Sequence, residues 1–418
     1  RDLPLQLEHW QRTVEGSHSV VLTEGQTTLK FINIDAEPVP SLLRGFSAPV
    51  ELDCDYTAAQ LMHLLAHDSD PFNRWEAGQQ LALRTAIELI GSGADPASAR
   101  PLNDAHIQAL RAVLRDPALD AAFKELVVTL PDEDYIAEQL DEVDPQRIHA
   151  VCDAMELQLA TDLQADWAWA YEQHHETGAY TPDPVSSGKR SLAGMALQML
   201  CLAARQNADT VWPGKAYQRV KDAGNMTDRL NALQALVYSG HELAGRALER
   251  FYALFKDEPL ALDKWFALQV YAPDHGGNIL PVVRTLMKHP DFSLRNPNRA
   301  RSVVFSYCHG NPAAFHRRDA AGYVYWADRV LELDALNPQL AARLARAMDA
   351  WARLAEPYRA SARAAIERVA AQASLSNDVR EVVTRALAGG DAAAAAVANT
   401  EPEARTAPTP DTQPKADA

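Results

Sequence analysis

Cysteine is scarce in this chain, and no two cysteines are spaced as a pair. The four cysteines, Cys54, Cys152, Cys201 and Cys308, are scattered singly through 418 residues, with no C-x-x-C motif. This spacing argues against a disulfide framework and against a cysteine-ligated zinc site. We therefore expect four free thiols in a reducing compartment, and a cytoplasmic location.

Long apolar runs and an excess of positive charge are also missing. No run approaches the roughly 20 apolar residues of a membrane helix, and the first residues lack the charged-then-apolar order of a signal peptide. The chain carries 40 Lys and Arg residues against 56 Asp and Glu residues, a net charge of -16. Because affinity for nucleic acid comes from Lys and Arg that neutralise phosphates, this balance argues against a nucleic-acid partner. We expect a soluble globular protein with no membrane partner.

The short motifs of common enzyme classes do not occur. The sequence has no G-x-S-x-G, no Walker-type G-x-x-x-x-G-K and no G-x-G-x-x-G after a predicted strand. The aromatic groups Trp167 with Trp169, and Trp265 with Phe266, lie among apolar residues, which is more typical of a core than of a stacking surface. The residues alone predict no self-contained active site.

The stretch EQHHETGAY, residues 172–180, imitates half of a zinc-protease motif. In H-E-x-x-H two histidines one helical turn apart bind zinc, and the glutamate polarises the bound water. Here His175 and Glu176 begin the motif, but Ala179 takes the place of the second histidine and Gly178 interrupts the turn. We interpret the stretch as the polar C-terminal end of a helix.

Two other places imitate a metal site less closely. The stretch GHELAG, residues 240–245, has Gly245 where the second histidine is needed. His63 and His67 have the i, i+4 spacing that puts both rings on one helix face, but no base stands beside them. We therefore expect these motifs to be structural, and no metal ligand in the chain.

Short alternating stretches predict β structure over residues 1–55. The segments LPLQL, HSVVLT, TTLKFINI and APVELDCD are separated by turn-forming residues. We predict a partial antiparallel β-sandwich. Because the alternation of Leu3, Leu5 and Leu7 is already under way at the first residues, we expect this domain to be truncated.

Helical periodicity runs over residues 56–390. Asp70 predicts an N-cap, with Pro71 in the first turn and Gly91 beyond the end. Asn225 predicts a second cap. Many such helices follow one another with short connections and without a clean fixed period. They predict an irregular α-solenoid, an armadillo- or HEAT-like superhelix of antiparallel helix pairs, in a mainly α protein.

The last predicted helix leads into a tail without large apolar side chains. Val379, Val382 and Val383 form an apolar stripe, and Gly389 is expected to end the helix. Residues 391–418 are rich in Ala, Pro, Thr and charge. Such a segment cannot bury enough apolar surface to offset the entropy of ordering, so we predict a disordered tail.

Six segments are too specific to be generic helix or strand sequence. In chain order they are EPVPSLLRGFSAPVELD (37–53), NMTDRLNAL (225–233), LDKWFALQV (262–270), NPNRARSVV (296–304), NPAAFHRRDAAGY (311–323) and LDALNPQLAARL (333–344). Together they resemble the C-terminal half of the bacterial zinc aminopeptidases N, the alanyl aminopeptidases of the gluzincin class. The resemblance extends from about Leu3 to about Leu387.

The resemblance implies a place within a larger enzyme. The resemblance implies an enzyme of four domains: an N-terminal β saddle, a thermolysin-like catalytic domain, a small Ig-like β-sandwich and a C-terminal helical superhelix. This chain is similar to most of the third and all of the fourth. The zinc motif H-E-x-x-H and the amine-binding G-x-M-E-N segment belong to the catalytic domain, and neither occurs here. The resemblance thus implies a chain that is inactive alone, with zinc in the catalytic domain, and with the other domains and peptide substrates as partners.

The same resemblance points to two residues of the substrate chamber. In the family the helix beginning N-P-Q turns polar side chains toward the primed side of the substrate, which corresponds here to Gln339 and Arg343. Their i, i+4 spacing puts both on one helix face. The alternative is that Arg343 is a solvated or ion-paired surface residue. Arg299 and Arg301 are weaker candidates, and we interpret them as packing or inter-helix hydrogen-bonding residues.

Two other functions remain open on the sequence. A stand-alone α-solenoid could have kept the scaffold, lost the protease and use its concave face to hold a protein partner. An independent metalloenzyme could use His63, His67 and nearby carboxylates. An upstream reading frame that encodes H-E-x-x-H and G-x-M-E-N would favour the aminopeptidase over the stand-alone α-solenoid. A metal analysis tests the independent metalloenzyme.

Overall fold

The chain is mainly helical. The computed structural model describes residues 3–8 and 16–400, with side chains up to residue 390. The chain divides into two compact units, Arg1–His316 and Arg317–Ala418. Within the described residues no helix is long and apolar enough to cross a membrane. The predicted domain boundaries at residues 55 and 390 stay predictions.

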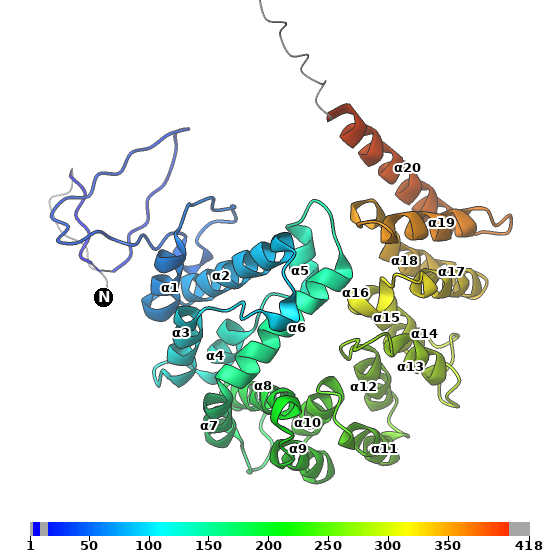
Figure 1. The fold of residues 1–418 in the computed structure, drawn as a ribbon. Coiled ribbons are helices and arrows are strands. Elements are labelled where there is room, and N and C mark those ends of the chain that lie inside the picture. The colour runs from blue at the N-terminus through cyan, green and yellow to red at the C-terminus, as the bar shows by residue number, and fades with distance from the viewer. Residues whose placement is uncertain (1–2, 9–15, 401–418) are drawn as a thin grey trace, which may run out of the picture. The chain divides into compact units, whose positions relative to one another are not determined.

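From α1 onward the first unit consists of helices joined by short connections (Figure 1). Its α-helices are α1 (Ala58–His67), α2 (Pro71–Ser92), α3 (Asp104–Arg115), α4 (Ala121–Val128), α5 (Glu133–Glu138), α6 (Pro145–Asp162), α7 (Gln164–His174), α8 (Pro184–Asn207), α9 (Val211–Asp222), α10 (Met226–Tyr238), α11 (Leu243–Phe255), α12 (Pro259–Val270), α13 (Ile279–Leu286), α14 (Pro297–Ala300), α15 (Ser306–Gly310) and α16 (Pro312–Phe315). The 3₁₀ turns η1 (Arg44–Phe46) and η2 (Pro96–Ser98) and the π-helix η3 (Arg301–Phe305) complete the unit.

Two helix starts predicted from sequence are confirmed. The Asp70 carboxylate accepts a hydrogen bond from the Asn73 amide at 3.0 Å and caps α2. The Asn225 side chain caps α10 in the same way. The predicted end of α2 at Gly91 is wrong by two residues. Gly93, with φ of 68°, ends the helix because glycine adopts the left-handed conformation without a Cβ clash.

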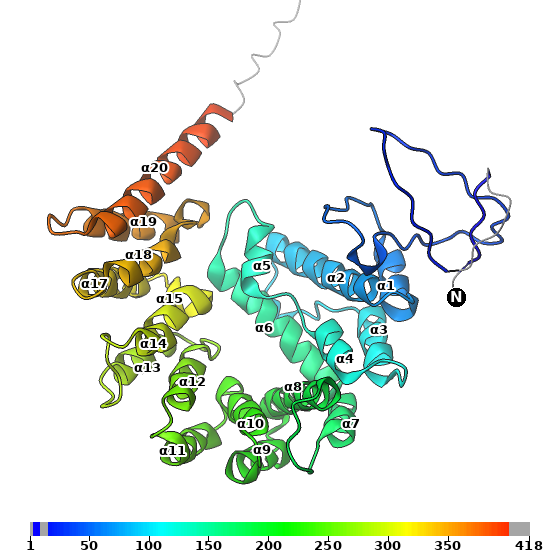
Figure 2. The same ribbon diagram turned by 180° about the vertical axis from the view of Figure 1, so that it is seen from behind.

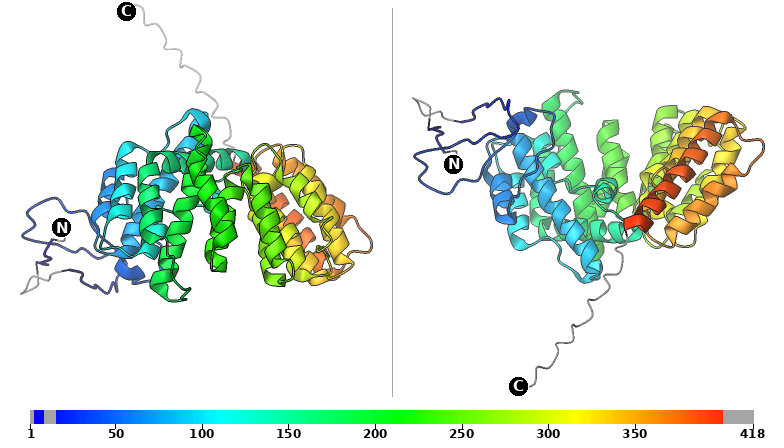
Figure 3. Two further views of the ribbon diagram at one scale, coloured as in Figure 1. Left: turned by 90° about the horizontal axis from the view of Figure 1, so that it is seen from below. Right: turned by 90° about the horizontal axis from the view of Figure 1, so that it is seen from above.

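Helix α8 is the centre of the first unit. It packs against α4, α6, α7, α9 and α10, and Leu192, Ala196, Leu200 and Cys201 along its length are fully buried. Its chain neighbours α7 and α9 are among these partners, and Figure 3 shows the helices of this unit lying side by side. This packing of successive helices is the arrangement expected of helical repeats.

The β-sandwich predicted over residues 1–55 is not confirmed, since the described part of this range forms no strand. Leu7 and Phe31 form an isolated antiparallel bridge, flanked by backbone hydrogen bonds of 2.9 Å and 3.0 Å. Val21 and Leu22 are 83% and 67% exposed. A strand pair needs a third strand or a packed apolar face to be stable, and these side chains are not covered by other described residues.

Residues 41–46 are attached to the turn between α1 and α2. Nη1 of Arg44 donates to Oδ1 of Asp68 at 3.0 Å, and its Nη2 donates to the Ser69 hydroxyl at 2.7 Å. The Gly45 amide donates to the Asp70 carboxylate at 3.0 Å. These polar contacts therefore hold residues 41–46, which precede α1, against the turn between α1 and α2.

The described part of the second unit contains four α-helices (Figure 2). They are α17 (Ala321–Asp334), α18 (Pro338–Ala345), α19 (Tyr358–Ala370) and α20 (Asn377–Thr400), with the 3₁₀ turns η4 (Arg346–Met348) and η5 (Trp351–Arg353) between α18 and α19. Helix α17 packs against α18 and α19, and α20 packs against the same two helices. Trp326 is fully buried and donates its indole N–H to the Leu344 carbonyl at 3.0 Å.

The predicted end of the last helix at Gly389 is wrong. Helix α20 continues to Thr400, beyond both Gly389 and Gly390. The Trp351 ring lies where a Cβ on Gly390 would be, and its indole N–H donates to the Ala386 carbonyl at 2.9 Å. Gly390 therefore provides space for an aromatic ring. Residues 401–418 of the predicted disordered tail lie outside the described residues.

Candidate functional site

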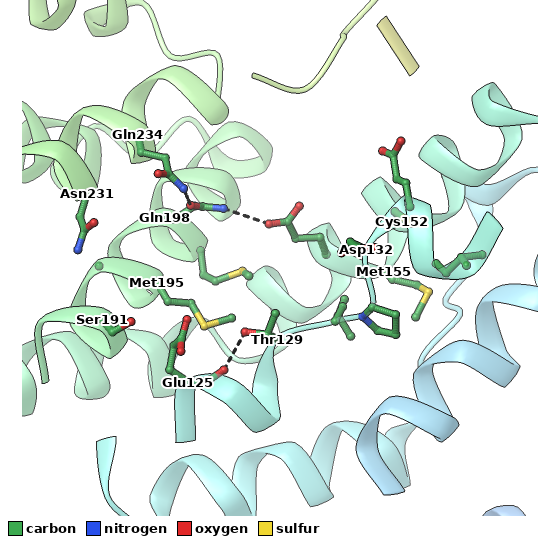
Figure 4. Close-up of a pocket in the computed structure, with 17 residues that line it drawn as sticks. Glu125, Thr129, Asp132, Cys152, Met155, Ser191, Met195, Gln198, Asn231 and Gln234 are labelled. Atoms are coloured by element: carbon green, nitrogen blue, oxygen red, sulfur yellow. Dashed lines mark hydrogen bonds between the residues drawn. The ribbon is translucent and has the colours of Figure 1, made fainter. Parts of the chain in front are cut away.

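A cavity of about 480 Å³ lies among α4, α5, α6, α8 and α10 of the first unit (Figure 4). It is lined by Glu125, Thr129, Leu130, Pro131, Asp132, Glu133, Ile136, Cys152, Met155, Glu156, Ser191, Gly194, Met195, Gln198, Met199, Asn231 and Gln234. Its volume is within the range of about 300 to 1,000 Å³ found for small-molecule sites. The lining combines carboxylates and amides with apolar side chains.

Helices α8 and α10 turn polar side chains to this cavity, together with the apolar Met195 of α8. Ser191, Met195 and Gln198 follow one another at helical spacing on α8, and Asn231 and Gln234 do so on α10. These polar residues interrupt the apolar stripe that is expected of a helix in a core. The cavity was not predicted from the sequence, although the interrupted stripes can be seen in the sequences of α8 and α10.

Glycine on α8 allows α10 to pack closely. A Cβ on Gly194 would overlap the Asn231 side chain, so the two helices could not keep their present separation with a larger residue. The Asn231 amide nitrogen instead donates to the Arg190 carbonyl at 3.2 Å. This contact sets one wall of the cavity.

A chain of side-chain amides joins three helices across the cavity. Nε2 of Gln234 donates to Oε1 of Gln198 at 3.0 Å, and Nε2 of Gln198 donates to Oε1 of Glu156 at 3.3 Å. Two of the dashed lines in Figure 4 follow this chain from α10 through α8 to α6, and the third joins Thr129 and Glu125. The chain holds the Glu156 carboxylate at the wall with a neutral donor.

The cavity is electrostatically negative. Four carboxylates line it, and no Lys, Arg or His belongs to the lining residues that the structure describes. Burial raises the pKa of both Glu125 and Glu156, and the charge of Asp153 adds to the effect at Glu156. Burial also raises the pKa of the Cys152 thiol, and neighbouring carboxylates raise it further. The thiol therefore stays protonated at neutral pH.

One lining carboxylate has a basic partner outside the cavity. Nδ1 of His149 lies 2.6 Å from Oε1 of Glu133, and Oε2 of Glu133 is buried without a hydrogen bond from the described residues. Burial lowers the pKa of His149, but the hydrogen bond and charge of Glu133 outweigh this, and the pKa is raised overall. Glu125 and Glu156 form no ion pair with a cationic side chain of the described residues, and the charge of His149 acts on Glu156 less strongly than the burial that raises its pKa.

The predicted metal-like motifs are not brought together with further ligands. His63 and His67 lie on α1 with ring centroids 5.1 Å apart, and both are exposed. Burial and the charge of His63 lower the pKa of His67. Among the described residues, no group of three or more His, Cys, Asp or Glu is placed to hold a metal ion.

The other two motifs have structural contacts. Helix α7 ends at His174, as the interpretation of residues 172–180 required, and Oε1 of Glu176 accepts from Lys189 at 3.3 Å. His241 precedes α11 and accepts the Leu243 amide at 3.1 Å. The four cysteines form no disulfide.

Gln339 and Arg343 lie on the same face of α18 in the second unit. Both side chains are exposed, and neither makes a hydrogen bond or ion pair with a residue that the structure describes. The opposite face of the helix, with Leu340 and Leu344, is buried. The alternative of an ion-paired Arg343 therefore finds no partner among the described residues, whereas the alternative of a solvated Arg343 stays open.

Arg299 has the structural role predicted for it. It is 6% exposed, donates to the backbone carbonyls of Pro259 and Asp291 at 3.1 Å, and pairs with Asp263. Arg301 is exposed and donates to the Asn298 side chain at 3.2 Å. Arg299 thus joins α12 and α14, whereas Arg301, the first residue of η3, contacts the preceding turn in α14.

Comparison with known proteins identifies the family. The family model described as a domain of unknown function, DUF3458_C, with ARM repeats matches residues 58–388, and the DUF3458 model with an Ig-like fold matches residues 2–55. The chain belongs to the DUF3458 family. Residues 58–388 thus fit an ARM-repeat domain, in agreement with the helical succession of the structure.

The aminopeptidase N relatives match most of this chain but less than half of their own length. The protein of Caulobacter vibrioides is 35% identical over 376 residues, which are 90% of this chain and 42% of that relative. The protein of Escherichia coli K12 is 34% identical over 369 residues, 88% of this chain and 41% of that relative. The chain corresponds to the C-terminal part of an aminopeptidase N, as the resemblance predicted.

A solved aminopeptidase structure has a similar fold. Legionella pneumophila aminopeptidase A, crystallised in complex with aspartic acid, has a TM-score of 0.74 and 27% identity to this chain. The similarity covers 87% of this chain and 43% of that one.

Proposed function

We propose that this chain is the non-catalytic C-terminal portion of a zinc-dependent aminopeptidase N, which removes N-terminal amino acids from peptides. It forms part of the wall of the substrate chamber and is inactive alone. The observation that carries the proposal is the similarity of about 90% of the chain to about 42% of aminopeptidase N. Zinc and the catalytic groups belong to the catalytic domain of such an enzyme, which with the N-terminal domain and the peptide substrate is its partner.

Gln339 and Arg343 contact the primed side of the peptide in this proposal. Their exposure on one face of α18, without partners among the described residues, supports this role, because an arginine held in an ion pair would have to give up that contact first. The guanidinium presents a planar fork of N–H donors that matches a carboxylate or peptide carbonyl. A cytoplasmic location stays a prediction.

A chimaera tests the proposal directly. The chain is joined to Caulobacter vibrioides aminopeptidase N in place of the segment that it matches, and hydrolysis of an alanyl chromogenic substrate is measured. We expect zinc-dependent turnover by the chimaera and none by the purified chain. Zinc-dependent turnover by the chain alone would contradict the proposal. A folded, zinc-loaded chimaera without activity would favour the alternative, a stand-alone α-solenoid that binds a protein partner.

A further inference from the structure

The cavity among α4, α6, α8 and α10 combines negative charge with an apolar surface. Glu125 and Glu156 line it without an ion pair to a cationic side chain of the described residues, and His149 acts on Glu156 only through its charge. Met155, Met195 and Met199 line it as well, from α6 and α8. A buried carboxylate without a cation is costly, and methionine side chains adapt to flexible aliphatic groups.

The amide chain leaves acceptors for a ligand. The nitrogen of Gln234 is used by Gln198, and that of Asn231 by the Arg190 carbonyl, so both residues retain their side-chain oxygens as acceptors. Together with the carboxylates, these oxygens make the polar lining rich in acceptors. A ligand that supplies several N–H donors and positive charge complements it.

We infer that this cavity binds an alkylammonium or alkylguanidinium group, with the charged head at Glu125 and Glu156 and the aliphatic stem on the methionines. Both the charge and the donors of such a head match the lining, and the volume of about 480 Å³ accommodates a side chain of this size. The raised pKa of the two glutamates is consistent with this, since a bound cation would relieve the cost of their burial.

The source of the group that we favour is a Lys or Arg side chain of a peptide, and this identification rests on the proposed function. A free amine carries the same cationic group, and the experiment below distinguishes it from the side chain of a peptide. The cation site itself rests on the lining alone. Binding can therefore be measured on the chain without any catalysis.

The test is calorimetric titration of the full chain with three probes. Ala-Ala-Ala-Lys-Ala carries the ammonium, the norleucine analogue keeps the aliphatic stem without the charge, and pentylamine is the free amine. We expect the lysine peptide to bind at least about tenfold more tightly than the norleucine peptide, because a charge-assisted hydrogen bond is lost. Glu156→Gln should weaken the binding of the lysine peptide by a similar factor. Glu172→Gln, which removes the same charge from an exposed position on α7, should leave its affinity unchanged.

Three outcomes decide the inference. Equal binding of the lysine and norleucine peptides, or no effect of Glu156→Gln in a variant with unchanged circular dichroism, would overturn the cation site. Pentylamine binding as tightly as the lysine peptide would support the site and overturn its assignment to a peptide. Failure of all three probes would overturn the inference while leaving the proposed aminopeptidase function to its own chimaera test.

Discussion

Nε2 of Gln198 donates a hydrogen bond to Oε1 of Glu156 across 3.3 Å, and this contact connects α8 to α6. A neutral amide thus holds the carboxylate of a partly buried glutamate. Since the donor carries no charge, the carboxylate keeps most of its negative potential, and the cavity wall stays attractive to a cation.

The affinity for the lysine peptide should depend on pH. The pKa of Glu156 is raised, so it takes up a proton at higher pH than an ordinary glutamate, and affinity should fall as the pH drops through that range. The pKa of Glu125 is raised as well, so its protonation adds to the loss of affinity. The pKa of His149 is also raised, and its protonation reduces the negative potential of the cavity further. Calorimetry between pH 7.5 and 4.5 measures the effect. Glu156→Gln should flatten the profile, and an unchanged profile would contradict this prediction.

Stability should fall in mildly acidic solution because of His106. This side chain is 2% exposed on α3, and burial lowers its pKa to about 4. Below its ordinary pKa of 6.5 the unfolded chain binds the proton and the folded chain does not, so the free energy of unfolding decreases as the pH falls from 6.5 to 4. The contribution between pH 7.5 and 5 is about 2 kcal/mol. Urea titrations of the wild type and His106→Gln should differ in this pH dependence by that amount, and parallel profiles would exclude the histidine as its source.

Loss of the Arg44 guanidinium should release the segment that precedes α1. The Asp68 side chain is 2% exposed, and its Oδ2 has no hydrogen bond from the described residues. Arg44→Ala would leave this buried carboxylate without its cation. The substitution should therefore lower the free energy of unfolding by about 2 kcal/mol. Hydrogen exchange at the Gly45 amide should accelerate. Arg246→Ala, at an exposed position on α11, is the control that should change neither quantity.

Two glycines on helices should respond oppositely to alanine. Gly194→Ala should lower the free energy of unfolding by about 1 to 3 kcal/mol, because its Cβ would overlap Asn231 and force α8 and α10 apart. Gly214→Ala on α9 has open space around its Cβ and should stabilise by up to about 1 kcal/mol. Urea unfolding measures both. Similar effects of the two substitutions would show that close packing at Gly194 does not limit stability.

Arg343 should affect catalysis in the active chimaera without affecting folding. Arg343→Ala should raise KM for a tripeptide about tenfold, since a charge-assisted hydrogen bond to the substrate is lost, but should change little for an alanyl anilide that lacks a primed residue. Arg343→Lys should restore only part of the affinity, because an ammonium cannot form the paired hydrogen bonds of a guanidinium. Arg346→Ala, also exposed, is the matched control. An equal loss for both substrates would contradict direct contact with the primed side.

The features predicted correctly from the sequence are local ones. A cap such as Asp70 or Asn225 bonds to an amide three residues away, so its partner is determined by the chain itself. The expected ends at Gly91 and Gly389 failed because a glycine does not by itself end a helix. Both lie inside a helix with open space where a Cβ would be, and α2 ends only at Gly93, whose φ of 68° is left-handed. The β-sandwich was not confirmed since strands need partners, which local alternation does not supply.

The sequence by itself determined the helical character, the helix starts and the family, because periodicity, caps and ordered motifs are properties of short segments. Tertiary structure decided which polar residues share a cavity. Glu125, Glu156, Gln198 and Gln234 come from four helices far apart along the chain, and they meet because α8 packs against the other three. The physical reason is that side-chain periodicity gives the face of a helix, whereas the neighbour of that face depends on the packing of the whole unit.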